Sequence, residues 1–406
     1  ILLSMKILHR ADWHIGKKLH KYDLAQDFDL FINWLISLVK EKKIDVILVS
    51  GDVFDLANPS SEARRQFYST LVKLHQLNCR IIITGGNHDS PSVLNAPREI
   101  LEQLHISIVG NLPENISDCI FAFPENTEPQ VIIAAIPFLR DSELRRISDG
   151  ISYEDRLLAI QDGMAQIFNN AKDYCSEHYP NIPAIAMGHL FATGEISTSD
   201  SEREIQVGNE ARFDTQRLGG FQYIALGHIH KPQRVHSNIP TFYSGSPIPL
   251  SFSERKDQKR ILLLDTEKGF EPESIPIPSF RKLIKIEGNL SEISIKLNAL
   301  RDTSILTNLI ELQLIEPFYS VKIEEDFNFL INNFSIPNYE IVKTRMQFND
   351  RLQSSSQLFE ENISLTELRP QEIFSKLLDT ECIEEAQKQK LMLAFQELQD
   401  SLNDFI

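Results

Sequence analysis

Short apolar segments alternate with helix-like segments along the first two thirds of the chain. Strand-like segments, many rich in β-branched residues, occur at 5–11, 44–50, 79–84, 131–136, 182–187, 221–226 and 260–265. Between several of them apolar residues recur at helical spacing, as in residues 24–43 and 61–77, the second with Ser61 as its expected N-cap. This alternation is typical of an α/β domain whose strands are covered by helices.

The pattern changes near residue 275, where "ESIPIPSF" indicates a linker. Residues 276–345 contain three further strand-like segments separated by helical patterns, which predicts a small α+β domain. In 346–406 the spacer "QSSSQ" precedes two amphipathic helices, whose apolar stripes are Ile373, Phe374, Leu377, Leu378 and Leu391, Ala394, Phe395, Leu398, Leu402. These helices either pack on their own domain or dock on a partner. The polar, glycine-bounded stretch 194–220 predicts a long surface loop.

Composition narrows the class of protein. The formal charge of −16 argues against a protein that coats nucleic acid by charge alone, although carboxylates that hold metal ions also count as negative. The four cysteines form no CxxC pair, so we expect reduced thiols in a cytoplasmic protein. The longest apolar runs, such as "VIIAAI", are far too short to span a bilayer, and no signal segment is recognisable.

Metal-capable side chains follow the strand-like segments at five places. In order they are Asp12 and His14; Asp52 and Asp55; Asn87, His88 and Asp89; His189; and His228 with His230. Each motif alone is weak, because a lone GNHD is often a turn and a lone GH is often a structural histidine. The ordered set is strong, because ligands in α/β sheets bind beyond the carboxyl ends of the strands.

These residue types suit the hydrolysis of phosphate esters. Two divalent ions about 3.5–4 Å apart can bind both the attacking and the leaving oxygen and generate hydroxide near neutral pH. One carboxylate must bridge the ions, and Asp52 is the natural choice. The mixture of imidazole nitrogen with carboxylate or amide oxygen, without thiolate, suits manganese, iron or zinc better than magnesium.

The ordered set resembles the calcineurin-like metallophosphoesterase superfamily, and within it the SbcD branch of nuclease subunits. The segments "MKILHRADWHIGK", "DVILVSGDVFD", "ITGGNHDS", "ALGHIHKPQ" and "YSGSPIPLSF" carry this resemblance. It implies a metallophosphoesterase core of two packed β-sheets flanked by helices in 5–275. It further implies a capping, DNA-binding domain in 276–345 and a linker with helices that dock a partner in 346–406.

The resemblance also implies roles for individual residues. One ion would be held by Asp12, His14, Asp52 and His230, and the second by Asp52, Asn87, His189 and His228. His88 is then the catalytic histidine, with Asp89 orienting its imidazole, while the alternative for His88 is a structural histidine. Asp55 either contacts the metal site directly, supports a residue that does, or only caps the turn. Arg10 stands where family members carry a small hydroxyl residue, and it either touches a phosphate or points elsewhere.

The activity implied is a manganese-dependent DNA nuclease that cleaves double-strand ends and hairpins in repair and recombination, beside the nucleoid. The sequence has no GxxxxGK[ST] loop, so ATP hydrolysis would come from an SbcC-type coiled-coil ATPase, in a complex with two copies of each subunit. Basic clusters containing Lys17, Lys18 and Lys256, and a third at 281–285, are compatible with DNA contact, although such clusters are usually solvated surface. The rival functions are a small-molecule phosphomonoesterase or nucleotide pyrophosphatase, and a non-enzymatic scaffold.

Overall fold

Two six-stranded mixed sheets pack face to face. The computed structural model describes residues 5–125, 127–144, 153–192, 213–301 and 304–348, and scattered residues between 374 and 395. The first sheet has the order β14 (Gly269–Pro276), β13 (Arg260–Asp265), β1 (Lys6–Arg10), β4 (Val46–Ser50), β5 (Arg80–Thr84) and β6 (Ile106–Val109). The second has the order β11 (Gln233–Arg234), β12 (Thr241–Tyr243), β10 (Tyr223–Gly227), β9 (Ala184–His189), β8 (Val131–Ala135) and β7 (Ile120–Phe123).

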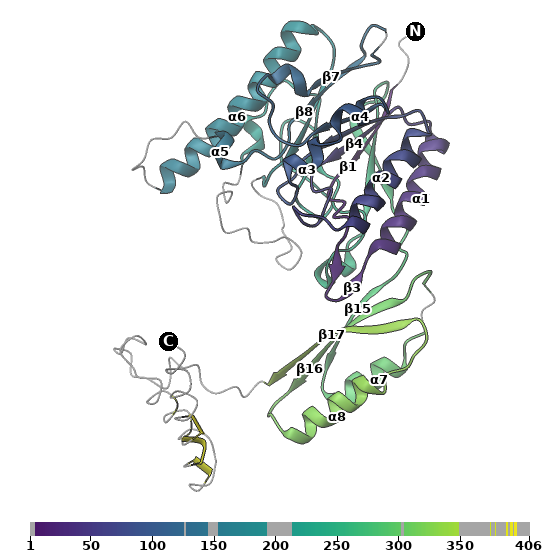
Figure 1. Ribbon diagram of the computed structural model, residues 1–406, viewed down its shortest axis with the longest axis vertical. Coiled ribbons are helices and arrows are strands. Elements are labelled where there is room, and N and C mark those ends of the chain that lie inside the picture. The colour runs from purple at the N-terminus through teal and green to yellow at the C-terminus, as the bar shows by residue number, and fades with distance from the viewer. Residues whose placement is uncertain are drawn as a thin grey trace. The chain divides into compact units, whose positions relative to one another are not determined.

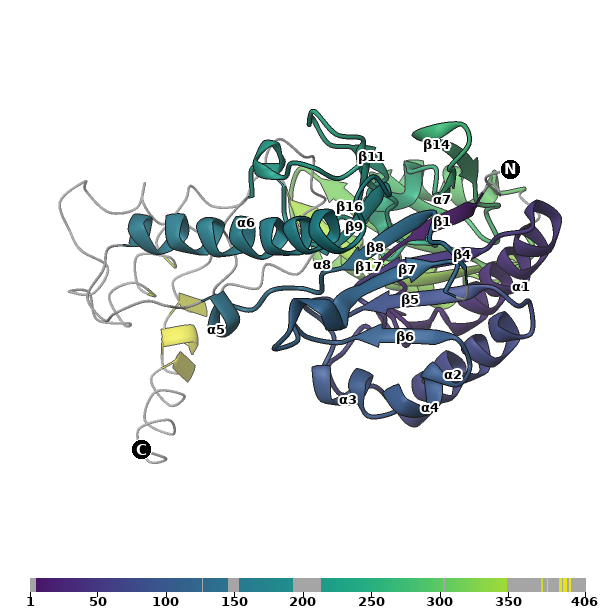
Figure 2. The same cartoon turned by 90° about the horizontal axis from the view of Figure 1, so that it is seen from above.

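Helices cover the outer face of each sheet, as the alternating pattern predicts. On the first sheet they are α1 (Ala25–Lys42), α2 (Ser61–His75), α3 (Pro91–Asn95) and α4 (Arg98–Glu102); on the second they are α5 (Asp141–Leu144) and α6 (Tyr153–His178). Figure 2 shows α1 and α2 on one side of the paired sheets and α6 on the other. A small hairpin of β2 (Lys18–Leu19) and β3 (Tyr22–Asp23) precedes α1.

Alternation along the first sheet divides its side chains between two cores. Ile7 and Leu48 lie in the core between the sheets, whereas Leu8 and Ile47 lie in the core beneath the helices. All four are completely buried. The same alternation decides where the neighbouring polar residues of β1 point, and it places His9 between the sheets and Arg10 toward α1.

The parallel strands all run toward one edge of the paired sheets. β1, β4, β5 and β6 are parallel neighbours in the first sheet, and β8, β9, β10 and β12 are parallel neighbours in the second. Their carboxyl ends therefore meet at this edge, where four of the five predicted motifs follow β1, β4, β5 and β10, and His189 is the last residue of β9.

One helix start differs from its prediction. The N-cap of α2 is Ser60 and not Ser61, because Ser60 has extended backbone angles and its side chain accepts the N–H of Ala63 at 3.2 Å. A serine pair offers two equivalent caps in the sequence, and only the backbone angle of the first permits the bond. Glu62 lies in the first turn of α2.

A three-stranded sheet follows, in the order β15 (Leu283–Gly288), β16 (Asn308–Glu316) and β17 (Tyr339–Phe348). Helices α7 (Leu290–Asn298) and α8 (Val321–Asn332) lie together on one side of it (Figure 1), which confirms a small α+β segment. An Asn289–Glu292 capping box starts α7. The chain divides into two compact units, of which the larger contains both six-stranded sheets.

Some predictions fall wholly or partly outside the described residues. The spacer is one, and so is most of the predicted loop at 194–220. Five stripe residues of the two C-terminal helices are described: Phe374, Leu378, Leu391, Ala394 and Phe395. The rings of Phe374 and Phe395 stack with centroids 4.1 Å apart. Cys79, Cys119 and Cys175 are buried free thiols, as expected. Within the described residues, the search for helices long and apolar enough to cross a membrane finds none.

Candidate metal centre

The predicted ligands meet at the carboxyl edge of the paired sheets. Among the described residues, three groups of side chains place their ligand atoms within 4.8 Å of one another. One consists of His14, Asp55 and His88, and the other two are cluster A (Asp12, His14 and His230) and cluster B (Asp52, His189 and His228). Four of the six residues in clusters A and B have positive φ angles that are uncommon outside glycine: Asp12, His14, Asp52 and His228. Such strain costs about 1–3 kcal/mol per residue and is typical of functional sites.

His228 and His230 belong to different clusters. Strand β10 ends at Gly227, and the φ of 106° at His228 turns the chain away from the strand direction. His228 then joins cluster B, His230 joins cluster A, and Ile229 between them is completely buried in the core. Leaving the strand is what allows alternate residues to reach one site.

In cluster A the Nε2 lone pairs of His14 and His230 face each other. Nδ1 of His14 lies 3.4 Å from a carboxylate oxygen of Asp55, and Nδ1 of His230 lies 3.5 Å from one of Glu254. A carboxylate opposite Nδ1 favours the tautomer with the proton on Nδ1, so each Nε2 carries a lone pair. The two Nε2 atoms are 3.0 Å apart. Oδ2 of Asp12 is also buried without a partner among the described residues. A cation satisfies all three atoms at once.

Cluster B is arranged around the amide of Asn87. Nδ1 of His189 donates to the carbonyl oxygen of Ser50 at 2.9 Å, which leaves Nε2 facing Asn87 Oδ1 at 2.9 Å. Nδ1 of His228 lies 3.1 Å from the same oxygen. Burial lowers the pKa of His228 to about 3, so this imidazole is neutral. Burial also lowers the pKa of His189, but the neighbouring Asp52 carboxylate outweighs it and raises the value to about 9. The cluster therefore favours a positive charge, which a bound metal ion would supply in place of a proton.

Asp52 belongs to cluster B and also faces cluster A. Its Oδ2 is 3.5 Å from Nε2 of His14 and 3.4 Å from Nε2 of His189. Two glycines make room for this arrangement, because a Cβ on Gly86 would lie 2.1 Å from Asp52 Oδ1 and a Cβ on Gly227 would lie 1.8 Å from the carbonyl oxygen of Ser50. The geometry matches what a bridging carboxylate requires, and the donor set of both clusters fits divalent ions.

Comparison with known proteins agrees with this geometry. The sequence profile of the calcineurin-like phosphoesterase family matches residues 5–232, and that of the Type 5 capsule protein repressor C-terminal domain matches residues 279–381. The SbcD component of the SbcCD nuclease from Escherichia coli K12 is 30% identical over 96% of this chain and 97% of its own length. The chain belongs to the SbcD branch of the calcineurin-like phosphoesterase family.

Further SbcD relatives cover shorter parts of the chain. The SbcD protein of Rhodobacter capsulatus is 32% identical over 68% of this chain and 69% of its own length. That of Bacillus subtilis is 29% identical over 75% of this chain and 78% of its own length. This SbcD-family chain is therefore a phosphoesterase of the nuclease type, with candidate His/Asp metal sites at its strand ends.

His88 lies at the rim of the clusters and is half-buried. Its backbone N–H donates to Asp52 Oδ1 at 2.9 Å, and its Nδ1 donates to the carbonyl oxygen of Asp55 at 2.9 Å. A carbonyl only accepts, so in the neutral ring Nε2 carries the lone pair and is the nitrogen that can exchange a proton. The ring centroids of His88 and His14 are 4.9 Å apart.

The structure contradicts the role predicted for Asp89. Its carboxylate accepts three backbone N–H groups, from Val53 (3.0 Å), Phe54 (2.9 Å) and Gly86 (2.9 Å). None of these bonds involves the imidazole of His88, which Asp55 orients instead. Asp89 therefore ties the turn after β5 to the turn after β4, and these bonds give it neither a catalytic nor a histidine-orienting contact.

Of the two orientations expected for Arg10, the structure shows the one that points away from the site. It is completely buried, with Nη1 donating to the carbonyl oxygen of Arg260 and the guanidinium 5.5 Å from the ring of Phe31 in α1. Alternation along β1 sends this side chain to the helix-covered face, away from the edge where the ligands meet. A contact of Arg10 with DNA is therefore excluded in this arrangement.

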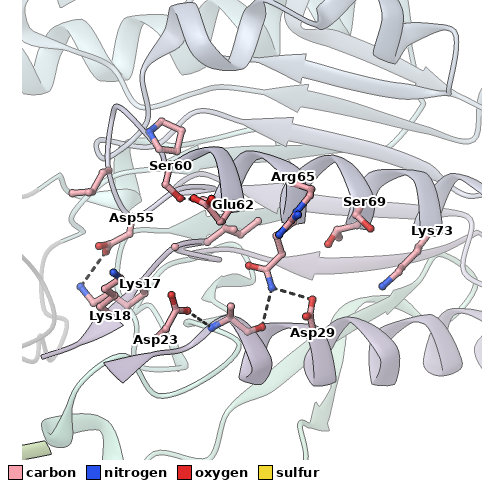
Figure 3. Close-up of a pocket in the computed structure, with 18 residues that line it drawn as sticks. Lys17, Lys18, Asp23, Asp29, Asp55, Ser60, Glu62, Arg65, Ser69 and Lys73 are labelled. Carbon is pink, nitrogen blue, oxygen red and sulfur yellow. Dashed lines mark hydrogen bonds and ion pairs between the residues drawn. The ribbon is translucent and has the colours of Figure 1, made fainter. Parts of the chain in front are cut away.

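The predicted basic clusters divide into exposed and buried members. Lys18 and Lys256 are exposed, and Lys17 forms an ion pair with Asp55 at 3.0 Å. A groove between α1 and α2 has a volume of about 930 Å³, and its lining includes Arg65 and Lys73. Figure 3 shows Lys17 and Lys18 at one end of it. Arg281, by contrast, is buried in a bidentate ion pair, with its Nε and Nη2 donating to Asp27 at 2.6 and 2.7 Å.

Sequence reasoning missed two charged residues behind cluster A, Glu254 and Lys259. Both are buried, and they form an ion pair at 2.5 Å. The run "ERKDQKR" looks solvated, so its pattern assigns Lys259 to a basic surface cluster. No spacing rule connects these residues to His230. The one available indication is that both lie between the apolar segments "PLSF" and "ILLL".

Proposed function

We propose that this chain hydrolyses phosphodiester bonds in DNA with two divalent ions. Asp12, His14, Asp52 and His230 would hold one ion, and Asp52, Asn87, His189 and His228 the other. Mn²⁺ is the favoured ion, with Mg²⁺, Fe and Zn as alternatives. When bound, such ions lower the pKa of water and neutralise charge on the phosphate. The observation that carries the proposal is the convergence of lone pairs from both clusters on either side of Asp52.

The chain's own residues then position the substrate and move a proton. His88, when its imidazole is protonated, would donate the Nε2 proton to the leaving oxygen and return to the neutral ring, because its Nδ1 proton is held by the carbonyl oxygen of Asp55. Asp52 holds the backbone of His88 through Oδ1 while its other oxygen faces both clusters. Lys18 and Lys256 are exposed cations that would contact the DNA backbone, and Lys17 would join them from its ion pair with Asp55.

We further propose a division of labour along the chain. Residues 5–275 would form the nuclease domain, 276–345 a cap that helps to select DNA, and 346–406 the segment that docks an SbcC-type coiled-coil ATPase. The relatives are named as subunits of SbcCD, which supports such a partner. The complex would act on double-strand ends and hairpins in repair and recombination, in the cytoplasm beside the nucleoid.

A homodimer is part of the same proposal. Tyr68 and Val72, one turn apart on α2, are exposed to 37% and 48% and offer an apolar contact surface. The double variant Y68E/V72E should elute with half the mass of the wild type when light scattering follows size exclusion. L158E, on the exposed face of α6, is the matched control and should keep the dimer mass. A monomeric wild type would contradict the dimer.

The direct test uses end-labelled duplex and hairpin DNA, with Mn²⁺ or Mg²⁺, with and without the ATPase. Cleavage that falls as salt rises is expected, because lysine–phosphate contacts release counterions. His88→Ser should retain metal and lose most turnover. Hydrolysis of p-nitrophenyl phosphate without any cleavage of DNA would replace the nuclease by a small-molecule phosphomonoesterase.

A further inference from the structure

A buried charged network lies directly behind His230. Glu254, in the 3-10 helix Phe252–Lys256, is completely buried, and Lys259 is 4% exposed. Burying two charges costs several kcal/mol per ion unless their bonding capacity is filled. Lys259 Nζ fills its capacity with Glu254 Oε2 (2.5 Å), Ser246 Oγ (2.9 Å) and the carbonyl oxygen of His230 (3.0 Å).

The second oxygen of Glu254 is directed at the imidazole. Glu254 Oε1 lies 3.5 Å from Nδ1 of His230, and this nitrogen is buried without a hydrogen-bond partner among the described residues. The backbone of His230 is held as well, because its carbonyl oxygen accepts both Lys259 Nζ and the N–H of Ser246 at 3.1 Å. The network therefore fixes the main chain of His230 and faces its side chain with a carboxylate.

We propose that Glu254 is a positioning residue that fixes the tautomer and the orientation of His230 for metal binding, with Lys259 compensating its buried charge. A carboxylate that accepts the Nδ1 proton places the lone pair on Nε2, which faces Nε2 of His14 at 3.0 Å. It also raises the basicity of the ligand, and loss of such a partner typically weakens metal binding about 10- to 100-fold. This inference rests on the proposed metal role of cluster A.

The competing explanation is a buried ion pair that only holds the segment before β13. Two double variants separate these explanations, because both remove the two charges together and leave neither buried alone. E254Q/K259M retains an amide oxygen that can accept the Nδ1 proton, whereas E254L/K259M offers no acceptor. A purely structural pair predicts the same metal affinity for both.

Mn²⁺ titration, followed by electron paramagnetic resonance, measures the number and the affinity of bound ions. The wild type should bind two ions, and H230A should lose one. E254L/K259M should lower the affinity for one of the two ions about 10- to 100-fold and leave the affinity for the other unchanged. The affinity of E254Q/K259M should lie between that of this variant and that of the wild type. E311Q/K343M removes another carboxylate–lysine pair, at 2.8 Å, in which Glu311 is buried and Lys343 is half-buried, and should bind like the wild type.

The two possible failures are distinguishable. If H230A binds both ions with wild-type affinity, the metal assignment is wrong and the inference falls with it. If H230A loses one ion but folded E254L/K259M retains both at full affinity, the metal assignment stands and Glu254 has no positioning role. A measurement on the metal-free wild type needs no stable variant. With ¹⁵N-labelled histidine, the His230 resonances should report a proton on Nδ1, and a proton on Nε2 would overturn the inference.

Discussion

Asp89→Asn tests whether this carboxylate serves the fold or the chemistry. The asparagine has the same shape, but its NH₂ group must face a backbone N–H wherever it points. The least harmful orientation keeps an oxygen opposite Val53 and Gly86 and sets the NH₂ against the N–H of Phe54. One buried bond to a charged acceptor is then lost, at about 1.5–3 kcal/mol, and the two others lose their charge assistance. We expect a loss of about 2–4 kcal/mol in the free energy of unfolding.

Urea unfolding followed by circular dichroism measures this loss, with Asp173→Asn as the control. Asp173 pairs with Lys172 on the surface at 2.9 Å and should lose at most about 1 kcal/mol. The pH dependence of turnover on a phosphodiester should keep its shape in D89N, because the His88 imidazole is oriented by Asp55. Wild-type stability combined with a shifted pH profile would refute this reasoning and restore Asp89 as the partner of His88.

Three further perturbations test other parts of the structure. Burial lowers the pKa of His9 to about 3, so the stability that His9 contributes should be complete above pH 6.5 and fall below it, by about 2 kcal/mol at pH 5; His9→Gln should lessen the loss of stability at pH 5 by this amount in urea titrations, while the share of His228, whose pKa burial also lowers, remains. Asp27→Asn should lower the free energy of unfolding by about 3–5 kcal/mol, because it leaves Arg281 buried without its ion pair. The double variant D27N/R281M leaves no unpaired charge, so an equal loss in it would contradict this reasoning. Gly227→Ala should lower the free energy of unfolding by more than about 4 kcal/mol, because its Cβ would collide with the carbonyl oxygen of Ser50. Gly219→Ala, whose Cβ meets nothing within 4 Å, should change the urea midpoint of unfolding little, and equal midpoints for the two variants would contradict the close approach at Gly227.

The strand ends were predictable because each one combines two independent patterns. An apolar run predicts a strand, and a polar residue directly after it predicts a side chain at the carboxyl edge of the sheet. Asp12, Asp52 and His228 could therefore be placed together before the fold was known. The parallel topology of the first sheet then follows from the helices between its strands. Family resemblance supplied the division of the ligands, and the separation of His228 from His230 agrees with it.

Contacts between residues far apart in sequence were not predictable. Asp27 and Arg281 are 254 positions apart, and either one reads as surface charge by itself. In the sequence, Arg10 and Lys259 look like cations that contact DNA. Alternation along β1 instead turns Arg10 to the helix-covered face, and Lys259 is buried against the carboxylate of Glu254. Asp89 stands next to His88 in sequence, yet the turn directs its carboxylate to backbone N–H groups. In each case the deciding partner belongs to another element.

The central claim is that Asp52 joins two metal-binding clusters that cleave DNA. The most direct measurement compares wild type and Asp52→Asn, each with its ATPase, in one Mn²⁺ titration that records bound ions and cleavage of end-labelled duplex. The wild type should bind two ions per chain and cleave, and the variant should lose affinity for both ions and lose cleavage. Full cleavage by D52N, or no cleavage by the wild type with either metal, would contradict the account.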